Sequence, residues 1–245
     1  MAQRLQKFLA NSGIGSRRFC EDLIKEKKIF VNGKVAEIGS KVESGDEIIF
    51  EGKKIPHKNI FTKLILLNKP TGVLSSTKRE KNIPIVFDYL PDNEDQRHWI
   101  SVGRLDINTS GLMLFTNDGD FANFCMHPSS QIDREYLVRA RGNFTSQKKE
   151  QLLKGIRVDG EKLYFSDLVE GQKKGSNQWF SVCLKSGKNR EIRKLFNSIE
   201  MEVSRLKRTR FGPIFLPSTL KKGKHLMLDE KDIISLKEYG THQGI

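Results

Sequence analysis

The sequence contains few cysteines, and none of them is placed to form a disulfide framework or a metal site. Cys20, Cys125 and Cys183 are far apart in the chain, and no Cys-x-x-Cys pair occurs. The five histidines are equally scattered. Neither a Walker loop nor a Gly-x-Gly-x-x-Gly fingerprint after a strand is present. We therefore expect no metal and no cofactor, and side chains that act unaided if the protein is an enzyme.

Features that direct a chain to membranes are also missing. The 245 residues contain no apolar run long enough to cross a bilayer, no signal-peptide core and no amphipathic cationic end. Acidic residues are in the minority, because 43 lysines and arginines face 30 aspartates and glutamates, a formal net charge of +13. Such a charge without membrane segments points first to nucleic acid. We expect a cytoplasmic protein that does not bind membranes.

The first 50 residues carry signals for two short helices and a hairpin. Leu5, Phe8 and Leu9 recur at helical spacing, and Ser16 stands where a second helix would need its N-cap. The Asn32-Gly33 pair lies between two short β-prone runs. Because Asn-Gly readily supplies two positive φ angles, this pair predicts a type I′ hairpin turn.

One polar loop between two apolar runs is a candidate site. The run from Trp99 to Val102 enters a loop that carries Arg104 and Asp106, and the run from Leu112 to Phe115 leaves it. A carboxylate in such a loop can be a nucleophile, a base, a metal ligand or a turn former. Short polar side chains around it also shape loops through bonds to the backbone, so the loop alone does not decide among these roles.

A basic segment follows the strand predicted over residues 179–184. Between Lys185 and Arg210 there are nine basic and three acidic residues. Apolar residues between Ile192 and Ile199 recur at i, i+3, i+4 and i+7, which predicts an amphipathic helix from about Arg190 onward. Such clustering of positive charge is the footprint expected for phosphate contacts.

Several motifs together resemble those of a known enzyme family. Gly-Arg-Leu-Asp, then Thr-Ser-Gly-Leu and a Thr-Asn-Asp-Gly turn, span residues 103–119. Asn-Lys-Pro-Thr-Gly precedes them at residues 68–72, and His-Pro and then Arg-Glu-Tyr follow within residues 127–136. This series resembles the RsuA/RluB-type ribosomal RNA pseudouridine synthases. Residues 2 to about 50 resemble the small RNA-binding domain named after ribosomal protein S-four.

The resemblance implies a reaction and assigns its residues. Uracil would leave its ribose, rotate and rejoin through carbon, without a redox change or an energy input. Asp106 is implied as the nucleophile, Tyr136 as the stacking partner of the target base, and Arg193 as the cation paired with Asp106. Leu105 and Leu195 are expected to pack around the pocket. Whether the carboxylate attacks the sugar or the base stays open.

Basic residues along the chain are expected to contact RNA. Arg104 adjoins the nucleophile and would touch the RNA backbone or fill the stack that a flipped base vacates; a surface ion pair is the alternative. For the N-terminal group, a merely solvated helix face is the alternative. The other expected contacts are Arg4, Arg17, Arg18, Lys69, Lys188, Arg190, Lys194, Arg205, Lys207, Arg208 and Arg210.

The expected fold class is α+β with two domains. A small N-terminal α/β RNA-binding module covers residues 1–58, and a polar linker occupies about 51–60. A catalytic domain over residues 61–239 holds a largely antiparallel sheet flanked by helices. Residues 240–245 are expected to be a disordered tail. We expect the protein to be a monomer.

The motif around Arg190 guides the choice of substrate. Asn-Arg-x-x-Arg at residues 189–193 resembles the form found in large-subunit enzymes, so 23S ribosomal RNA or a pre-ribosomal particle is the expected partner. A small-subunit 16S rRNA synthase is one alternative, since it would share every catalytic residue. A non-catalytic RNA-binding or ribosome-assembly protein with the same fold is another. The joint presence of Asp106, Tyr136 and Arg193 argues against the latter.

Overall fold

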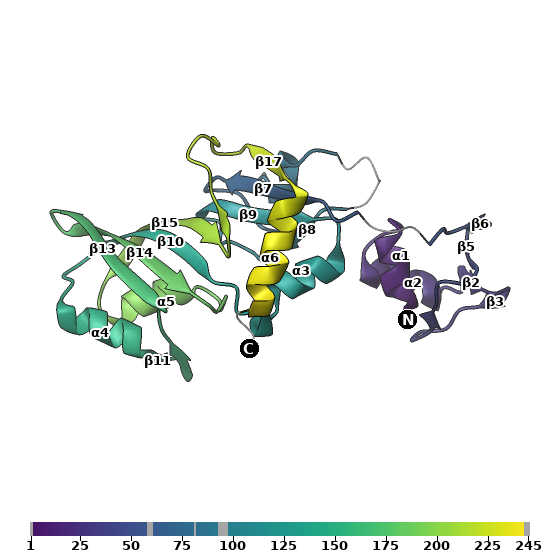
Figure 1. Cartoon of the computed structure of the whole chain (residues 1–245), viewed down its shortest axis with the longest axis horizontal. Helices are drawn as coiled ribbons and strands as arrows, with labels where there is room; N and C mark the ends of the chain where they lie inside the picture. Colours follow the sequence, from purple (N-terminus) through teal and green to yellow (C-terminus); the bar gives the residue numbers. More distant parts are fainter. Residues whose placement is uncertain (1, 58–60, 81, 93–97, 243–245) are drawn as a thin grey trace. The chain divides into compact units, whose positions relative to one another are not determined.

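The computed structural model describes residues 2–57, 61–80, 82–92 and 98–242 (Figure 1). The chain divides into two compact units, although we expected two continuous domains. The first comprises Met1–Thr62, Pro91–Ile100 and Asn117–Gly119, and the second comprises Lys63–Leu90, Ser101–Thr116 and Asp120–Ile245. Two short segments from later in the chain thus join the first unit. Among the residues that the structure describes, no helix has the length and hydropathy needed to span a bilayer.

The N-terminal helices form where the sequence predicts them. Helix α1 covers Leu5–Asn11 and helix α2 covers Arg17–Lys25. Helix α2 begins where Ser16 Oγ accepts a hydrogen bond from the Phe19 amide at 3.1 Å, which confirms Ser16 as its N-cap. Apolar residues of both helices pack into one core with Ile29 and Ile48 of the neighbouring strands.

Short strands complete this module. Strands β2 (Ile29–Val31) and β3 (Lys34–Val35) form the predicted hairpin, and the Asn32-Gly33 turn between them has positive φ at both residues. The sheet order is β3-β2-β5-β6, and β1 pairs with β4 in a second small sheet. The bounds of these strands are β1 Gln3–Arg4, β4 Lys41–Val42, β5 Ile48–Phe50 and β6 Lys53–Lys54.

The expected linker begins later in the chain than predicted. Strand β6 pairs with β5 in antiparallel register, and Ile55 is buried in the core of the module. Residues 51–55 therefore belong to the folded module, because their backbone and one apolar side chain are used by it. Residues 58–60, which the predicted linker also included, lie outside the described residues.

A nine-stranded sheet forms the framework for the candidate site. Its main path is β13-β14-β10-β15-β9-β7-β17, with β16 paired to β15 and β8 paired to β9. Strands β15 and β9 run parallel, whereas the other neighbours on the path are antiparallel, which confirms the largely antiparallel sheet. The bounds are β7 Leu64–Lys69, β8 Ile100–Val102, β9 Ser110–Thr116, β10 Arg134–Arg141, β13 Asp167–Lys174, β14 Asn177–Leu184, β15 Glu202–Phe211, β16 Ile214–Phe215 and β17 His225–Leu228.

Helices cover parts of this sheet (Figure 1). Helix α5 packs through Phe196, whose ring centroid lies 5.2 Å from that of Phe180 on β14 and 5.7 Å from that of Phe165. Helices α3 and α6 contact each other, because Gly240 lies against the ring of Phe124. The bounds are α3 Gly119–Met126, α4 Ser146–Lys154, α5 Glu191–Ser198 and α6 Glu230–His242, with 3-10 helices at Val86–Tyr89 and Pro128–Ser130 and a hairpin of β11 Ile156–Val158 and β12 Glu161–Leu163.

The C-terminal residues correct one expectation. We expected disorder from Gly240 onward, but helix α6 continues to His242. The Tyr239 hydroxyl donates a hydrogen bond of 2.7 Å to Asp133, and Gly240 fits closely against Phe124. These contacts anchor the last turn of the helix. Residues 243–245 lie outside the described part of the chain.

Candidate active site

The loop that carries Asp106 is held by the last residue of strand β7. Lys69 is fully buried, and its ammonium donates hydrogen bonds to the carbonyl oxygens of Pro70 at 3.0 Å, Asp106 at 3.2 Å and Thr109 at 2.9 Å. The Thr109 amide in turn donates to the Asp106 carbonyl at 2.9 Å. Burial lowers the pKa of Lys69 to about 8, and the charge of Asp106 acts in the opposite direction. The ammonium therefore fixes the backbone on which the candidate nucleophile is mounted.

Residues that follow Lys69 also form hydrogen bonds with the loop on both sides of Asp106. The Gly72 amide donates to the Ile107 carbonyl at 2.8 Å. Ser75 Oγ donates to the Leu105 carbonyl at 2.7 Å and accepts from the Leu105 amide at 3.2 Å. Leu105 is buried, and the Asp106 side chain is partly exposed. This supporting role of residues 69–75 was missed in the sequence, where the only signal was a Pro-x-Gly turn.

The parallel strand pair places the loop against β15. Ser110 pairs with Lys207 and Gly111 pairs with Arg208. Gly111 has a φ of +102°, and a Cβ at this position would lie 2.2 Å from the Arg208 carbonyl oxygen. Only glycine fits here, because both the backbone angle and the space exclude a side chain. The close approach holds the end of the Asp106 loop at the centre of the sheet.

Tyr136 lies on the strand beyond β15. Arg208 pairs with Gly111 on one side and with Tyr136 on the other, so the three residues form a row across the sheet. Neighbouring strands are about 4.8 Å apart, which puts the Tyr136 backbone roughly 10 Å from that of Gly111. The Tyr136 side chain is 9 % exposed. The register thus brings Tyr136 to the same part of the sheet as the Asp106 loop.

Arg193 projects from the first turn of helix α5 and is partly buried. Its Nη1 donates to the Val203 carbonyl on β15 at 2.9 Å. Burial lowers the pKa of Arg193 and the charge of Arg190 lowers it further, whereas the charge of Asp106 raises it. Asp106 and Arg193 are therefore close enough to interact electrostatically. The described residues include no direct ion pair between them, so the pairing stays a prediction. Leu195, on the same helix, is fully buried.

The basic loop before helix α5 is closed by a buried carboxylate. Glu191 accepts hydrogen bonds from Ser186 Oγ at 2.6 and 2.7 Å and from the Lys188 amide at 3.2 Å. Arg190, directly before it, has a φ of +51° in the left-handed region. Glu191 thus gives a fixed shape to a loop with three exposed cations, Lys185, Lys188 and Arg190. The sequence offered only a weak signal for this, an acidic residue in the first turn of a predicted helix.

Two basic residues predicted to contact RNA are buried instead. Lys69 has no exposed area, and Arg208 is 2 % exposed. The Nε of Arg208 donates to the Leu112 carbonyl at 2.7 Å, and its guanidinium lies 5.5 Å from the centre of the Phe211 ring. Strand β15 is internal to the sheet, so alternate side chains point to opposite faces and Arg208 points into the covered one. A surface contact with RNA does not fit either residue.

Arg210 is likewise committed to partners within the protein. Its guanidinium binds both oxygens of Asp133 at 3.0 and 2.9 Å and one oxygen of Glu135 at 3.1 Å. Hydrogen bonding to Asp133 raises the pKa of Arg210. Burial alone would raise the pKa of Asp133, but the hydrogen bonds from Arg210 and Tyr239 lower it overall. Arg210 therefore connects the sheet to helix α6, and the predicted RNA contact does not fit it.

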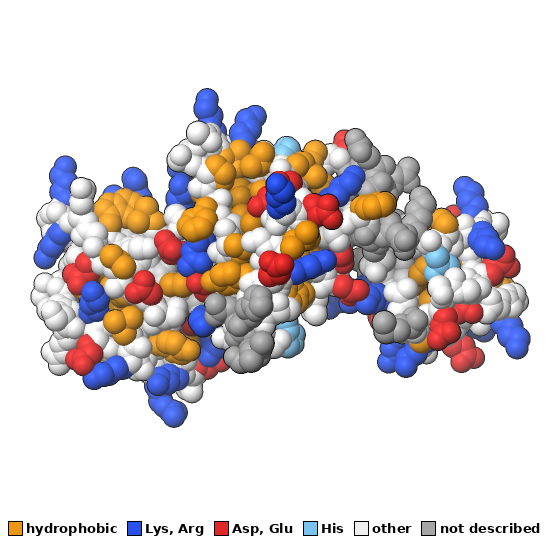
Figure 2. Space-filling view, in the orientation of Figure 1, with side chains coloured by type: hydrophobic (Ala, Val, Ile, Leu, Met, Phe, Trp, Pro, Cys, Tyr) orange, Lys and Arg blue, Asp and Glu red, His pale blue; other side chains and the backbone are white. Residues whose placement is uncertain are grey.

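The remaining predicted RNA contacts lie at the surface, where lysine and arginine side chains are common (Figure 2). Lys188 pairs with Glu161 at 3.4 Å and Lys194 with Asp159 at 2.7 Å. Such exposed pairs are weak and can exchange for phosphate contacts. The exposed or partly exposed set is Arg4, Arg17, Arg18, Arg104, Lys188, Arg190, Lys194, Arg205 and Lys207.

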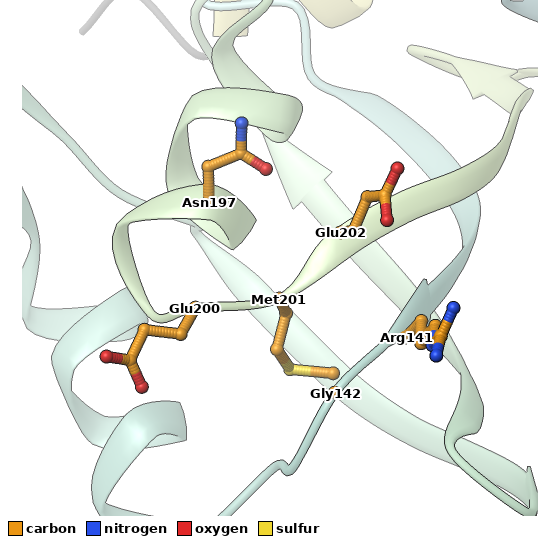
Figure 3. A pocket seen from close by; sticks show the side chains of 6 residues that line it. All are labelled: Arg141, Gly142, Asn197, Glu200, Met201 and Glu202. Atoms are coloured by element: carbon orange, nitrogen blue, oxygen red, sulfur yellow. The ribbon is translucent and has the colours of Figure 1, made fainter.

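A hollow with carboxylates around it lies apart from the residues of this site. A hollow of about 390 Å³ lies where β10 ends and β15 begins, and Glu200, Glu202 and Arg141 surround it (Figure 3). It contains neither Asp106 nor Arg193, and its two carboxylates disfavour an RNA phosphate. Within the described ranges, no group of three or more histidine, cysteine or acidic residues could hold a metal ion.

Both parts of this chain match known protein families. Residues 63–198 match the RNA pseudouridylate synthase family, and residues 3–48 match the S4 domain. A crystal structure of a pseudouridylate synthase has a similar fold, with a TM-score of 0.65 and 24 % identity, over 95 % of this chain and 99 % of that one. This likeness supports the fold alone.

Two curated relatives are much closer in sequence. The chain is 43 % identical over 242 residues to ribosomal large subunit pseudouridine synthase B of Pseudomonas aeruginosa. The aligned region covers 97 % of this chain but only 62 % of the relative. It is 44 % identical over 236 residues to the protein of the same name from Buchnera aphidicola, over 94 % of this chain and 91 % of the relative. The chain therefore spans less than two thirds of the first relative and nearly all of the second. With a match over more than half of its length and relatives above 40 % identity, the chain belongs to the RNA pseudouridylate synthase family.

Proposed function

We propose that this protein converts uridine to pseudouridine at specific positions of large-subunit 23S ribosomal RNA. The observation that carries the proposal is the geometry of the Asp106 loop. The buried Lys69 ammonium donates a hydrogen bond to the Asp106 carbonyl, and the charges of Asp106 and Arg193 interact. The substrate is inferred from the names of the relatives, which are large-subunit enzymes. The protein would act in the cytoplasm, on ribosomal RNA or on a pre-ribosomal particle.

The proposed chemistry assigns one task to each residue. The bond between the ribose C1′ and uracil N1 breaks, and a bond from C1′ to uracil C5 forms; the C5 hydrogen leaves and N1 gains a hydrogen. Asp106 is the nucleophile in this scheme, and Tyr136 stacks on the uracil while it is detached. The positive charges of Lys69 and Arg193 stabilise the carboxylate when the bound RNA excludes water from it.

The proposed RNA contacts lie around this site and on the N-terminal module. The target uridine must be flipped out of folded RNA, at a cost of a few kcal/mol that stacking and phosphate contacts offset. Arg104 beside the nucleophile and the loop closed by Glu191 would supply such contacts. Arg17 and Arg18 on α2 would add affinity from the S4 module. Since Lys69, Asp106, Tyr136 and Arg193 all come from one compact unit, a monomer is sufficient.

Mapping pseudouridine in ribosomal RNA tests the proposal. Cells that lack the protein should lose at least one pseudouridine in 23S RNA, and the wild-type gene should restore it. Asp106→Asn should not restore it, although RNA affinity should stay within a few fold, because the side chain keeps its shape and the main-chain bonds to Lys69 and Thr109 remain. Asp22→Asn, the same change at an exposed carboxylate on α2, is the control and should restore it.

Other results would revise the proposal in defined ways. Loss of a pseudouridine from 16S RNA instead would keep the activity and replace the substrate. Unchanged 23S and 16S maps would leave a non-catalytic RNA-binding protein as the better description. Full activity of Asp106→Asn would keep the activity and assign the nucleophile to another residue.

A further inference from the structure

One face of the main sheet is open where four strands carry cations and apolar groups. On strands β13, β14, β10 and β15, the face that holds Phe180 packs against helix α5 (Figure 1). The opposite face exposes Leu137 to 38 % and Val169 to 54 %. Because side chains alternate along a strand, Leu137 points away from the face that its neighbour Tyr136 shares with the helices. This open face is therefore distinct from the side of the sheet that carries Tyr136.

The strand register gathers three cations on the open face. Arg139 pairs directly with Arg205, and Lys207 lies two residues further along β15 on the same side. Like charges directly opposite each other repel, which is unfavourable unless an anion lies nearby. Nothing in the described ranges places a carboxylate within ion-pair distance of these three side chains. Arg139 Nε instead donates to Ser204 Oγ at 2.9 Å.

Lysines of the helix-covered side behave differently. Lys149 pairs with Glu170 at 3.5 Å, and Lys154 pairs with Glu150 at 2.6 Å. Lys188 and Lys194 also have acidic partners. Arg139, Arg205 and Lys207 thus lack the acidic partners that these lysines have and that Arg210, further along β15, finds in Asp133 and Glu135. An external polyanion would relieve their mutual repulsion.

An aromatic side chain lies next to these cations. Trp179 on β14 pairs with Arg139 and is partly exposed. On the neighbouring strand, Gly171 has no side chain to cover it, and a Cβ there would lie 3.2 Å from the Trp179 Cβ. Leu137 and Val169, both opposite Ser181 in the register, extend the apolar surface beside the indole. A flat sheet that offers an aromatic group and apolar side chains beside cations suits unpaired bases and their phosphates.

We propose that this open face, formed by Leu137, Arg139, Val169, Trp179, Arg205 and Lys207, binds a single-stranded segment of RNA. Bases stack on Trp179 and its apolar neighbours, and phosphates lie along Arg139, Arg205 and Lys207. Arg205 and Lys207 are about 7 Å apart along β15, and Arg139 lies directly opposite Arg205. This proposal extends the proposed function and rests on it, because that function is the reason for choosing RNA as the polyanion. It would hold a part of the substrate other than the nucleotide at Asp106.

Fluorescence of Trp179 tests the proposal directly. In a Trp99→Phe background, Trp179 is the only tryptophan, since the sequence has two. The probe is an oligoadenylate of about 12 nucleotides, within the span that one single-strand binding surface covers. It contains no uridine, so it cannot be a substrate at Asp106. We expect the probe to quench Trp179 and the quenching to weaken as salt is raised.

Charge variants show whether oligoadenylate binding depends on this face or only on the net positive charge of the protein. Arg139→Gln with Arg205→Gln should lower affinity for oligoadenylate by about tenfold or more and reduce the salt slope by about two units. Arg139→Lys with Arg205→Lys should retain most of the affinity, which shows that the fold tolerates change at both positions. Arg157→Gln, an exposed arginine on β11, is the matched control and should bind as the parent does.

Two results would overturn the proposal. One is a Trp179 fluorescence that does not change when oligoadenylate is added. The open face would then be a surface for a protein partner rather than for RNA. The other is equal loss of affinity in Arg157→Gln and in the double glutamine variant, which would indicate unspecific attraction. Since oligoadenylate binding needs no isomerisation, its outcome is independent of pseudouridine mapping. A failed map with intact quenching would refute the activity but not this surface.

Discussion

The buried ammonium of Lys69 donates a hydrogen bond of 3.2 Å to the main-chain carbonyl of Asp106. Two further carbonyls, of Pro70 and Thr109, complete its partners. A buried cation is costly, and this one is compensated by carbonyl dipoles and by the charge of Asp106 rather than by a direct ion pair. Lys69 thus acts on the candidate nucleophile through the backbone, as a positioning residue.

Replacing Lys69 by Met tests this role. The variant would leave three carbonyl oxygens without their donor, and each unsatisfied buried group costs roughly 1–3 kcal/mol, offset in part by the removed charge. We expect a lower free energy of unfolding in urea and a single-turnover rate that falls more than RNA affinity does. Lys162→Met, at an exposed position on β12, is the control. An unchanged rate in the Lys69 variant would show that the loop keeps its shape without the ammonium.

The depressed pKa of Lys69 predicts opposite pH trends for stability and rate. In the folded protein the pKa is about 8, whereas an unfolded lysine titrates near 10.4. Between these values the unfolded state binds more protons, so the lysine contribution to stability rises with pH and is lost as pH falls through about 8. The rate should fall over the same range, because a neutral amine has one donor fewer and no charge.

Urea unfolding and single-turnover rates between pH 7 and pH 10 measure both trends. The Lys69→Met variant should lack both. If wild-type stability and rate move in the same direction across this range, another group controls the titration.

The sequence predicts the local structure around this site better than it predicts which side chains are buried. Ser16 as a helix cap and Asn32-Gly33 as a hairpin turn follow from neighbouring residues alone, and both are confirmed. The burial of Lys69 and Arg208 depends on strands that are distant in the chain. A basic run such as residues 203–211 therefore looks uniformly exposed, although an internal strand turns every second side chain inward.

A substitution of Gly111 tests how closely strands β9 and β15 must approach each other. Gly111→Ala should destabilise the protein by at least about 2 kcal/mol, because a positive φ and a clash with the Arg208 backbone act together. Gly160→Ala is a matched control, since Gly160 has a φ of +79° with nothing within 4 Å of an added Cβ. It should cost only about 1 kcal/mol, for backbone strain. Equal losses in urea unfolding would mean that the close contact with Arg208 can relax.

Arg193 distinguishes two ways in which a cation can serve the reaction. If Arg193 binds only RNA phosphate, Arg193→Met should lower affinity and reduce the salt slope by about one unit, with a normal rate at saturating RNA. If it pairs with Asp106 once RNA is bound, the same change should leave a carboxylate without its partner in a site without water. The rate should then fall far more than affinity.

We expect the pairing, because the charge of Asp106 already acts on Arg193 in the free protein: burial and Arg190 lower the pKa of Arg193 overall, and Asp106 opposes them. Arg193→Lys should retain part of the rate, since the charge survives while the two-pronged geometry and the bond to the Val203 carbonyl change. Lys194→Met provides the contrast, because the adjacent lysine pairs with the exposed Asp159 and should affect affinity rather than rate. Single-turnover rates and RNA affinities of the three variants over a range of salt decide between the two roles. A normal rate for Arg193→Met at saturating RNA would assign Arg193 to the RNA backbone.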